Sequence, residues 1–150
     1  MLILFLAAAA DKLPPANPLP LVDTEEAAVM APVIALVDAL NRSDVAAMRA
    51  VTVAEGSATE TGDTPKVTPW PAFAAALKPG PERVEEVLGQ PAIELDGGAA
   101  MVWAPYTVRT NGRVTQCGYD HFDLVRVGGA WKVLHLTWSQ KKDGCGPDDG

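Results

Sequence analysis

Two short turn motifs late in the chain constrain its fold more than any other feature. Asn111-Gly112 is typical of a two-residue hairpin turn, because both positions tolerate a positive φ angle. Gly128-Gly129 can form a second turn of the same length. Segments rich in β-branched and aromatic residues flank both turns, which indicates an antiparallel meander. The strands predicted in this half of the chain are 83–95, 99–110, 113–127 and 130–141.

The first half of the chain is predicted to be mainly helical. Apolar residues recur at helical spacing over 25–41, and Ser43 can cap a short second helix over 44–50. A short strand over 51–59 precedes a third helix that begins near residue 68 and ends near residue 77. Helices first and hairpins later indicate an α+β domain rather than alternating α/β units.

The termini read differently from the domain, which we place at 23–142. Residues 1–10 resemble the apolar region of a secretory signal, with an Ala-x-Ala cleavage pattern, although no Lys or Arg precedes them. The run is too short for a membrane span, which needs about 20 residues. We therefore expect export to the periplasm or outside the cell; the alternative is an apolar N-terminus on a cytosolic protein. Prolines predict an extended linker over 11–22, and Gly, Asp and Pro predict an irregular tail over 143–150.

Composition excludes some partners and cofactors. The formal net charge of −7 argues against nucleic acid, because phosphate binding needs a basic face. No phosphate loop, Cys/His metal cluster or hydrolase elbow occurs, so no metal and no cofactor is expected. Cys117 and Cys145 are the two cysteines, and in an exported domain they predict one disulfide. The alternative is a buried thiol at Cys117.

Three segments resemble the nuclear transport factor 2-like superfamily, in particular its bacterial branch of polyketide-cyclase-like and lumazine-binding-like domains. They are 100–106 (AMVWAPY), 117–125 (CGYDHFDLV) and 131–138 (WKVLHLTW). The resemblance covers roughly 24–142. It implies a cone-shaped, curved antiparallel sheet packed on three N-terminal helices, with a pocket between sheet and helices, and a dimer. It implies no particular reaction, because one fold serves many functions.

Regular hairpin pairing predicts which side chains face that pocket. Without a bulge, Trp103 lies opposite Asp120, which in turn lies opposite Thr137. Asp120 and His135 would then share the concave face, where a carboxyl and an imidazole can move a proton on a bound substrate. The alternative is that Asp120 only orders the sheet by accepting hydrogen bonds from Thr137 or Trp103. The predicted ligand-binding residues are Met101, Trp103, Phe122, Trp131 and Thr137.

The outer sheet face is predicted to carry an apolar patch that forms a homodimer contact; the alternative is that the N-terminal linker or the tail covers it. Its residues are Tyr106, Tyr119, Leu134, Leu136 and Trp138. Three functions remain open on these grounds. The first is a binding module for a small apolar or aromatic molecule. The others are an acid/base enzyme of isomerase, cyclase or dehydratase type, and an interaction protein whose working surface is the dimer face.

Overall fold

The structure, a computed structural model, describes residues 14–146. The predicted signal peptide at 1–10, the start of the linker and the end of the tail lie outside the described residues. Within them the chain folds in the predicted order of helices followed by strands. The elements are α1 (Thr24–Arg42), α2 (Val45–Val51), β1 (Thr52–Glu60), β2 (Lys66–Pro69), α3 (Trp70–Ala76), β3 (Val84–Leu88), β4 (Ala92–Asp96), β5 (Ala99–Thr110), β6 (Arg113–Val127) and β7 (Ala130–Trp138).

The helix boundaries follow from capping chemistry. Asp23 accepts hydrogen bonds from the first-turn amides of α1, and Asp44 accepts one from Ala47 in α2. Ser43, the predicted cap of α2, instead ends α1 in the left-handed conformation. Pro32 lies inside α1 and is buried. None of the described helices is long and apolar enough to cross a membrane.

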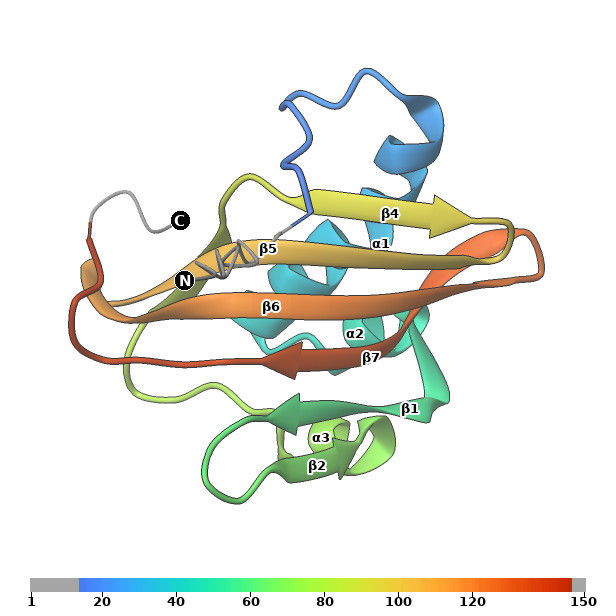
Figure 1. Cartoon of the computed structure of the whole chain (residues 1–150). Helices are drawn as coiled ribbons and strands as arrows, with labels where there is room; N and C mark the ends of the chain where they lie inside the picture. Colours follow the sequence, from blue (N-terminus) through green and yellow to red (C-terminus); the bar gives the residue numbers. More distant parts are fainter. Residues whose placement is uncertain (1–13, 147–150) are drawn as a thin grey trace, which may run out of the picture.

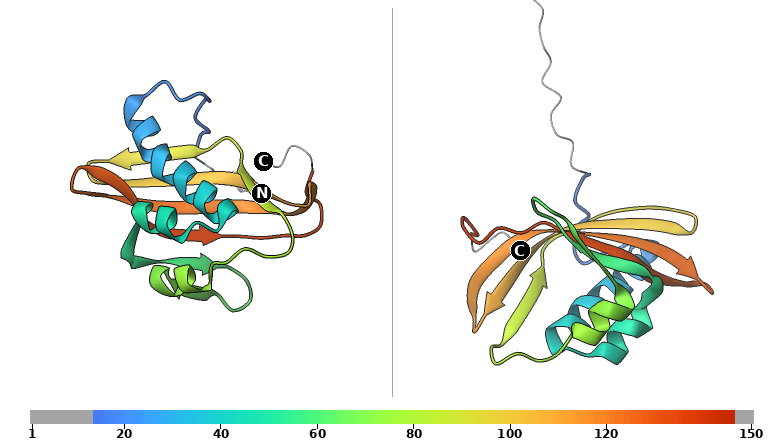
Figure 2. Two further views of the ribbon diagram at one scale, coloured as in Figure 1. Left: turned by 180° about the vertical axis from the view of Figure 1, so that it is seen from behind. Right: turned by 90° about the horizontal axis from the view of Figure 1, so that it is seen from below.

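The strands form one curved, open sheet, and the helices cover only one of its faces (Figures 1 and 2). The strand order is β2-β1-β7-β6-β5-β3, with β4 also paired to β5. β1 runs parallel to β7, so the sheet is mixed rather than wholly antiparallel as predicted. The core lies between the helices and the inner sheet face. It includes Leu36 and Met48 from the helices and Phe122 from β6, all with no exposed surface.

Two β-bulges overturn the predicted strand register. Both hairpin turns form as expected, with Thr110 opposite Arg113 and Val127 opposite Ala130. However, one extra residue, Thr115, interrupts the β5–β6 ladder, and another, Leu134, interrupts the β6–β7 ladder. An extra residue reverses the facing of every side chain beyond it relative to the partner strand. The predicted inner and outer faces are therefore partly exchanged.

The Leu134 bulge is held in place by α3 and β1. The indole nitrogen of Trp70 donates a 2.8 Å hydrogen bond to the Leu134 carbonyl, which satisfies a polar group released by the bulge. Gly56 on β1 allows this approach, because a Cβ there would lie 1.7 Å from the same carbonyl oxygen. The bulge is thus a specific feature that needs an indole donor and a glycine.

The chain after β7 remains attached to the sheet. Cys117 on β6 and Cys145 form a disulfide, the pairing expected from the cysteine count. Cys117 and Lys141 also exchange two backbone hydrogen bonds of 3.0 and 2.9 Å. The segment up to Cys145 is therefore part of the domain rather than a loose tail.

Candidate functional site

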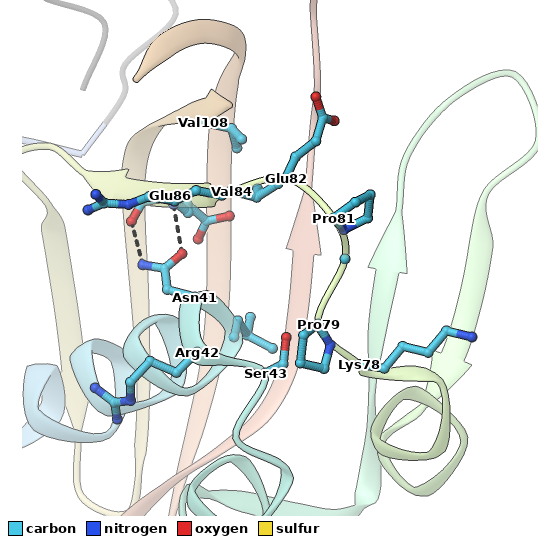
Figure 3. Close-up of a pocket in the computed structure, with 13 residues that line it drawn as sticks. Asn41, Arg42, Ser43, Lys78, Pro79, Pro81, Glu82, Val84, Glu86 and Val108 are labelled. Carbon is cyan, nitrogen blue, oxygen red and sulfur yellow. Dashed lines mark hydrogen bonds between the residues drawn. The ribbon is translucent and has the colours of Figure 1, made fainter. Parts of the chain in front are cut away.

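The site is a pocket of about 500 Å³ between the last turn of α1, the α3–β3 loop and the edge strand β3 (Figure 3). This volume is within the range usual for small-molecule sites. Its walls are mixed: prolines from the loop and aliphatic side chains from the helix and strands alternate with the polar residues Asn41, Arg42, Ser43, Lys78, Glu82, Arg83 and Glu86. The apolar lining residues are Leu40, Pro79, Pro81, Val84 and Val108.

Glu82 and Glu86 are the two carboxyl groups that line this pocket, and Asn41 fixes the position of Glu86. Glu86 belongs to β3, which among the described strands pairs with β5 alone, so one edge of its backbone is free of the sheet. The Asn41 side chain satisfies that edge: its amide donates to the Glu86 carbonyl at 2.9 Å, and its oxygen accepts from the Glu86 N–H at 2.7 Å. The charged ends of Arg42 and Lys78 point away from Glu86 (Figure 3).

Behind Glu86 lies Asp120 of β6, which is only 2% exposed. The Glu86 and Asp120 side chains share a hydrogen bond. Two ionised carboxylates cannot hydrogen-bond to each other, since both are acceptors, so the contact requires a proton. Without that proton, Asp120 Oδ2 is buried and has no donor. The two groups therefore form a proton-sharing acid pair.

The electrostatics of the pair agree with a shared proton. Burial raises the pKa of Asp120 to about 9, and the charge of Glu86 adds to this effect. Burial also raises the pKa of Glu86 to about 7, while its hydrogen bond with Asp120 acts in the opposite direction. Asp120 is the more deeply buried group and so holds the proton, donating it to Glu86. Glu86 thus presents to the pocket a carboxyl that can gain or lose a proton near neutral pH.

Tyr106 lies on the same inner face, although the sequence predicted it on the outer face. It is 1% exposed; its hydroxyl donates to the Ser139 carbonyl and accepts from Gln116 Nε2, each at 2.8 Å. Burial raises the pKa of Tyr106 to about 12, and the charges of Asp120 and Glu86 raise it further. The phenol is therefore a neutral structural neighbour of the acid pair.

The predicted convergence of Asp120 and His135 is wrong. Asp120 lies on the inner face as predicted, but the Leu134 bulge places His135 on the outer face, opposite Asp123. There His135 Nδ1 lies 3.1 Å from the hydroxyl oxygen of Ser57. The alternative, in which Thr137 or Trp103 donates to Asp120, is also wrong: the Leu134 bulge places Thr137 on the outer face, and the Thr115 bulge does the same to Trp103.

The predicted ligand-binding set is divided between the two faces. Met101, Trp103 and Thr137 lie on the outer face because of the bulges, whereas Phe122 and Trp131 lie on the inner face but are packed in the core. None of the five lines the pocket beside Glu86.

The predicted apolar outer patch is also wrong in most of its members. Tyr106 is buried on the inner face, Leu136 and Trp138 pack with the inner core, and Leu134 sits at the bulge. Tyr119 alone of the five is exposed, at 38%.

Sequence reasoning missed Glu86, although a signal was present. In a strand over 83–95, Val84, Glu86 and Leu88 are two positions apart and therefore lie on the same face. Leu88 packs against the core. A carboxyl group on the core side of a strand is unusual and can indicate a functional group. Among residues 14–146, no cluster of three His, Cys, Asp or Glu side chains is arranged to hold a metal ion.

Comparison with known proteins identifies the architecture. No protein-family model matches the sequence, and no curated protein is significantly similar to it. Solved structures do match. An NTF2-like protein with a cystatin-like fold from Novosphingobium aromaticivorans is 16% identical, with a TM-score of 0.66 over 83% of this chain and 86% of its own. A protein of unknown function with a cystatin-like fold from Nostoc punctiforme is 11% identical, with a TM-score of 0.67 over 79% and 92%.

A third similar structure is a protein of the NTF2-like family from Streptomyces avermitilis, described as a candidate dehydratase. It is 15% identical to this chain, with a TM-score of 0.66 over 78% of this chain and 96% of its own. The TM-scores show a common fold, whereas identities this low show no common activity. The chain shares with these structures an arrangement of three helices on one face of a curved, open sheet. It therefore has the nuclear transport factor 2-like α+β fold.

Proposed function

We propose that this protein binds a small, largely apolar molecule in the pocket beside Glu86, and that the molecule carries one neutral polar group. The observation that carries the proposal is the Glu86–Asp120 pair at an opening of about 500 Å³. The proline and aliphatic part of the lining favours an apolar or aromatic body. Glu86 accepts a hydrogen bond when ionised and can donate one when protonated, and its pKa of about 7 allows both forms near neutral pH, which suits a hydroxyl or carbonyl group.

The test is a ligand screen by thermal shift and ligand-observed NMR with aromatic and alicyclic alcohols and ketones. A ligand at 100 times its Kd should raise the free energy of unfolding by about 2.7 kcal/mol. Gly80→Trp is the blocking variant, because Gly80 lines the pocket and a Cβ there meets no atom within 4 Å. Glu86→Gln tests the polar contact, and Glu94→Gln on exposed β4 is its matched control. Ligands that bind Gly80→Trp and the native chain equally would show that the pocket is not the site.

Acid/base catalysis on the bound molecule is the second candidate function. It is favoured by the raised pKa of Glu86, about 7, which lets this pocket carboxyl exchange a proton at neutral pH. The candidate dehydratase from Streptomyces avermitilis has the same fold, which is compatible with acid/base chemistry on this fold. With a ligand in hand, Glu86→Gln should retain binding but abolish turnover. Binding without turnover in the native chain would leave the binding function alone.

We also propose that the chain is exported to the periplasm or outside the cell. Its support is the Cys117–Cys145 disulfide, because stable disulfides are typical of oxidising compartments. Cell fractionation of the full chain, with alkylation to count free thiols, tests this. Recovery in the cytosol with two free thiols would contradict export.

We further propose a homodimer through the outer sheet face, centred on other residues than those of the predicted apolar patch, apart from Tyr119. Within residues 14–146 no helix covers the outer face of β6, β7 and β1 (Figure 2), where Tyr119 is exposed and Thr137 pairs with Thr59. Light scattering should give twice the chain mass, and Thr137→Arg should halve it. A native chain that scatters as a monomer at micromolar concentration would rule out this dimer.

A further inference from the structure

A second pocket, of about 420 Å³, lies where β5, β6 and the chain after β7 meet. Among the described residues it is lined by Pro105, by residues 117–119 and by residues 139–141. It shares no lining residue with the pocket beside Glu86. Its volume is within the range usual for small-molecule sites, so it can hold a ligand of its own, whether or not the proposed function is correct.

The wall formed by residues 139–141 is fixed to β6 at its first residue. The Ser139 carbonyl accepts a hydrogen bond from the Tyr106 hydroxyl at 2.8 Å, and the Ser139 N–H donates to the Tyr119 carbonyl at 3.0 Å. Ser139 Oγ also accepts from the Tyr119 N–H at 3.1 Å. Gly118 allows this close approach, because a Cβ there would lie 2.1 Å from the Ser139 carbonyl oxygen.

The same wall is fixed again at its last residue. Lys141 and Cys117 exchange two backbone hydrogen bonds, and the disulfide joins Cys117 to Cys145 four positions further on. The chain after β7 therefore continues beside the start of β6 (Figure 1). A wall that is ordered before a ligand arrives lowers the entropic cost of binding.

The lining combines apolar surface with hydrogen-bond donors. Pro105 and Tyr119 lie opposite each other on β5 and β6 and supply the apolar and aromatic part. Trp103 stacks on Tyr119 at a ring separation of 5.2 Å and so restricts the ring. Ser139 Oγ already accepts one hydrogen bond, so its hydroxyl proton remains to be donated to a ligand.

The charge of the lining sets the sign of the ligand. Lys141 is the one charged side chain among the described residues that line this pocket, and no ion pair within residues 14–146 engages its ammonium. Glu60 accepts a hydrogen bond from Gln140 but does not itself line the pocket. Since the whole chain has a formal net charge of −7, a pocket with one positive charge and no negative one differs from the rest of the protein.

We propose that this pocket is a second binding site, which takes a small aromatic carboxylate. An ionised carboxylate only accepts hydrogen bonds and carries a single negative charge, which matches the Lys141 ammonium and the Ser139 hydroxyl. Its aromatic body lies against Pro105 and Tyr119.

The experiment uses the full chain, with benzoate as the probe and benzamide as its uncharged counterpart. Binding is measured by titration of the backbone amide NMR signals of Gly118 and Lys141. For a ligand of this size the expected Kd is in the low millimolar range. Lys141→Gln should weaken benzoate binding by about fivefold or more, because it removes a charge-assisted hydrogen bond. Benzamide should bind the native chain more weakly than benzoate by a similar factor.

Lys142→Gln is the matched control, because Lys142 has the same charge at the next position but does not line the pocket. Benzoate affinity should stay within about twofold in this variant. It should also be unchanged in Gly80→Trp, which blocks the pocket beside Glu86, so the two sites are tested separately.

Three results would overturn the proposal. The first is equal affinity for benzoate and benzamide, and the second is an equal loss in Lys141→Gln and Lys142→Gln. The third is the absence of shifts at Gly118 and Lys141 with about 20 mM benzoate, well above the expected Kd. Loss of benzoate binding in Gly80→Trp would likewise overturn it, since the ligand would then occupy the pocket beside Glu86.

Discussion

The proton shared by Glu86 and Asp120 makes the stability of this protein depend on pH in an unusual direction. Most native carboxyl groups have lowered pKa values, and they stabilise the fold as the pH rises through the acid range. Here the folded pKa of Asp120 is raised to about 9, so the folded state retains a proton that the unfolded chain loses near pH 4. The contribution of the pair to stability is complete below about pH 4 and is lost as the pH rises towards the folded pKa.

The magnitude follows from linkage. Each pH unit in this window lowers the contribution by about 1.4 kcal/mol per retained proton. Between pH 4.5 and 7.5 the upper limit is about 4 kcal/mol, and relaxation of the site reduces this to about 2 kcal/mol. Asp120→Asn replaces the protonated acid by a neutral amide of the same shape that can donate to Glu86. At pH 7.5 the variant should therefore be more stable than the native chain by about 2 kcal/mol, or about 4–8 °C in Tm.

The assay is thermal and urea unfolding of the native chain and Asp120→Asn at pH 4.5, 6.0 and 7.5. Asp96→Asn on exposed β4 is the control for the change in net charge. The difference between Asp120→Asn and the native chain should grow with pH, whereas the control difference should stay within about 0.5 kcal/mol. If Asp120→Asn is less stable at all three pH values by a constant amount, Asp120 is an ionised acceptor and the shared proton is refuted.

Three further predictions concern the supports of the site. Asn41→Ala removes two hydrogen bonds to the β3 backbone and should cost about 2 kcal/mol, with faster amide exchange confined to β3. Gly56→Ala places a Cβ 1.7 Å from the Leu134 carbonyl oxygen and should cost more than about 3 kcal/mol by urea unfolding. Reduction of Cys117–Cys145, which are separated by 28 positions, should cost about 3 kcal/mol; an unchanged Tm in reductant would contradict this.

The element order could be read from the sequence because local signals dominate it. The turns at Asn111-Gly112 and Gly128-Gly129 set the ends of β5, β6 and β7 as predicted, apart from the last three residues of the final strand. Gly89 and Pro91 separate β3 from β4, since proline cannot join the ladder normally. β2 was missed because it is short and depends on pairing with β1 rather than on its own composition.

Which residues meet at the site could not be predicted from such local signals, because this depends on the register between the strands. The bulge residues Thr115 and Leu134 carry no local signal: threonine and leucine are ordinary strand residues. What fixes the Leu134 bulge is the Trp70 indole, which is 64 positions away in the sequence. Counting residues from a hairpin turn cannot detect a contact of this kind. The resulting bulge places His135 on the face opposite to that of Asp120.

The Thr115 bulge decides whether the acid pair exists at all. β3 pairs with β5 without a shift, so Glu86 lies opposite Val108 whatever happens on β6. With the extra residue, Asp120 pairs with Ala104 on the inner face, beneath the pocket; without it, Asp120 would pair with Trp103 on the outer face. The burial that raises the pKa values of Glu86 and Asp120 therefore depends on one inserted residue, Thr115, near the turn between β5 and β6. The register set by this bulge and the pairing of two carboxyl groups under the pocket are therefore coupled, and this coupling supports the proposal that the pair has a function.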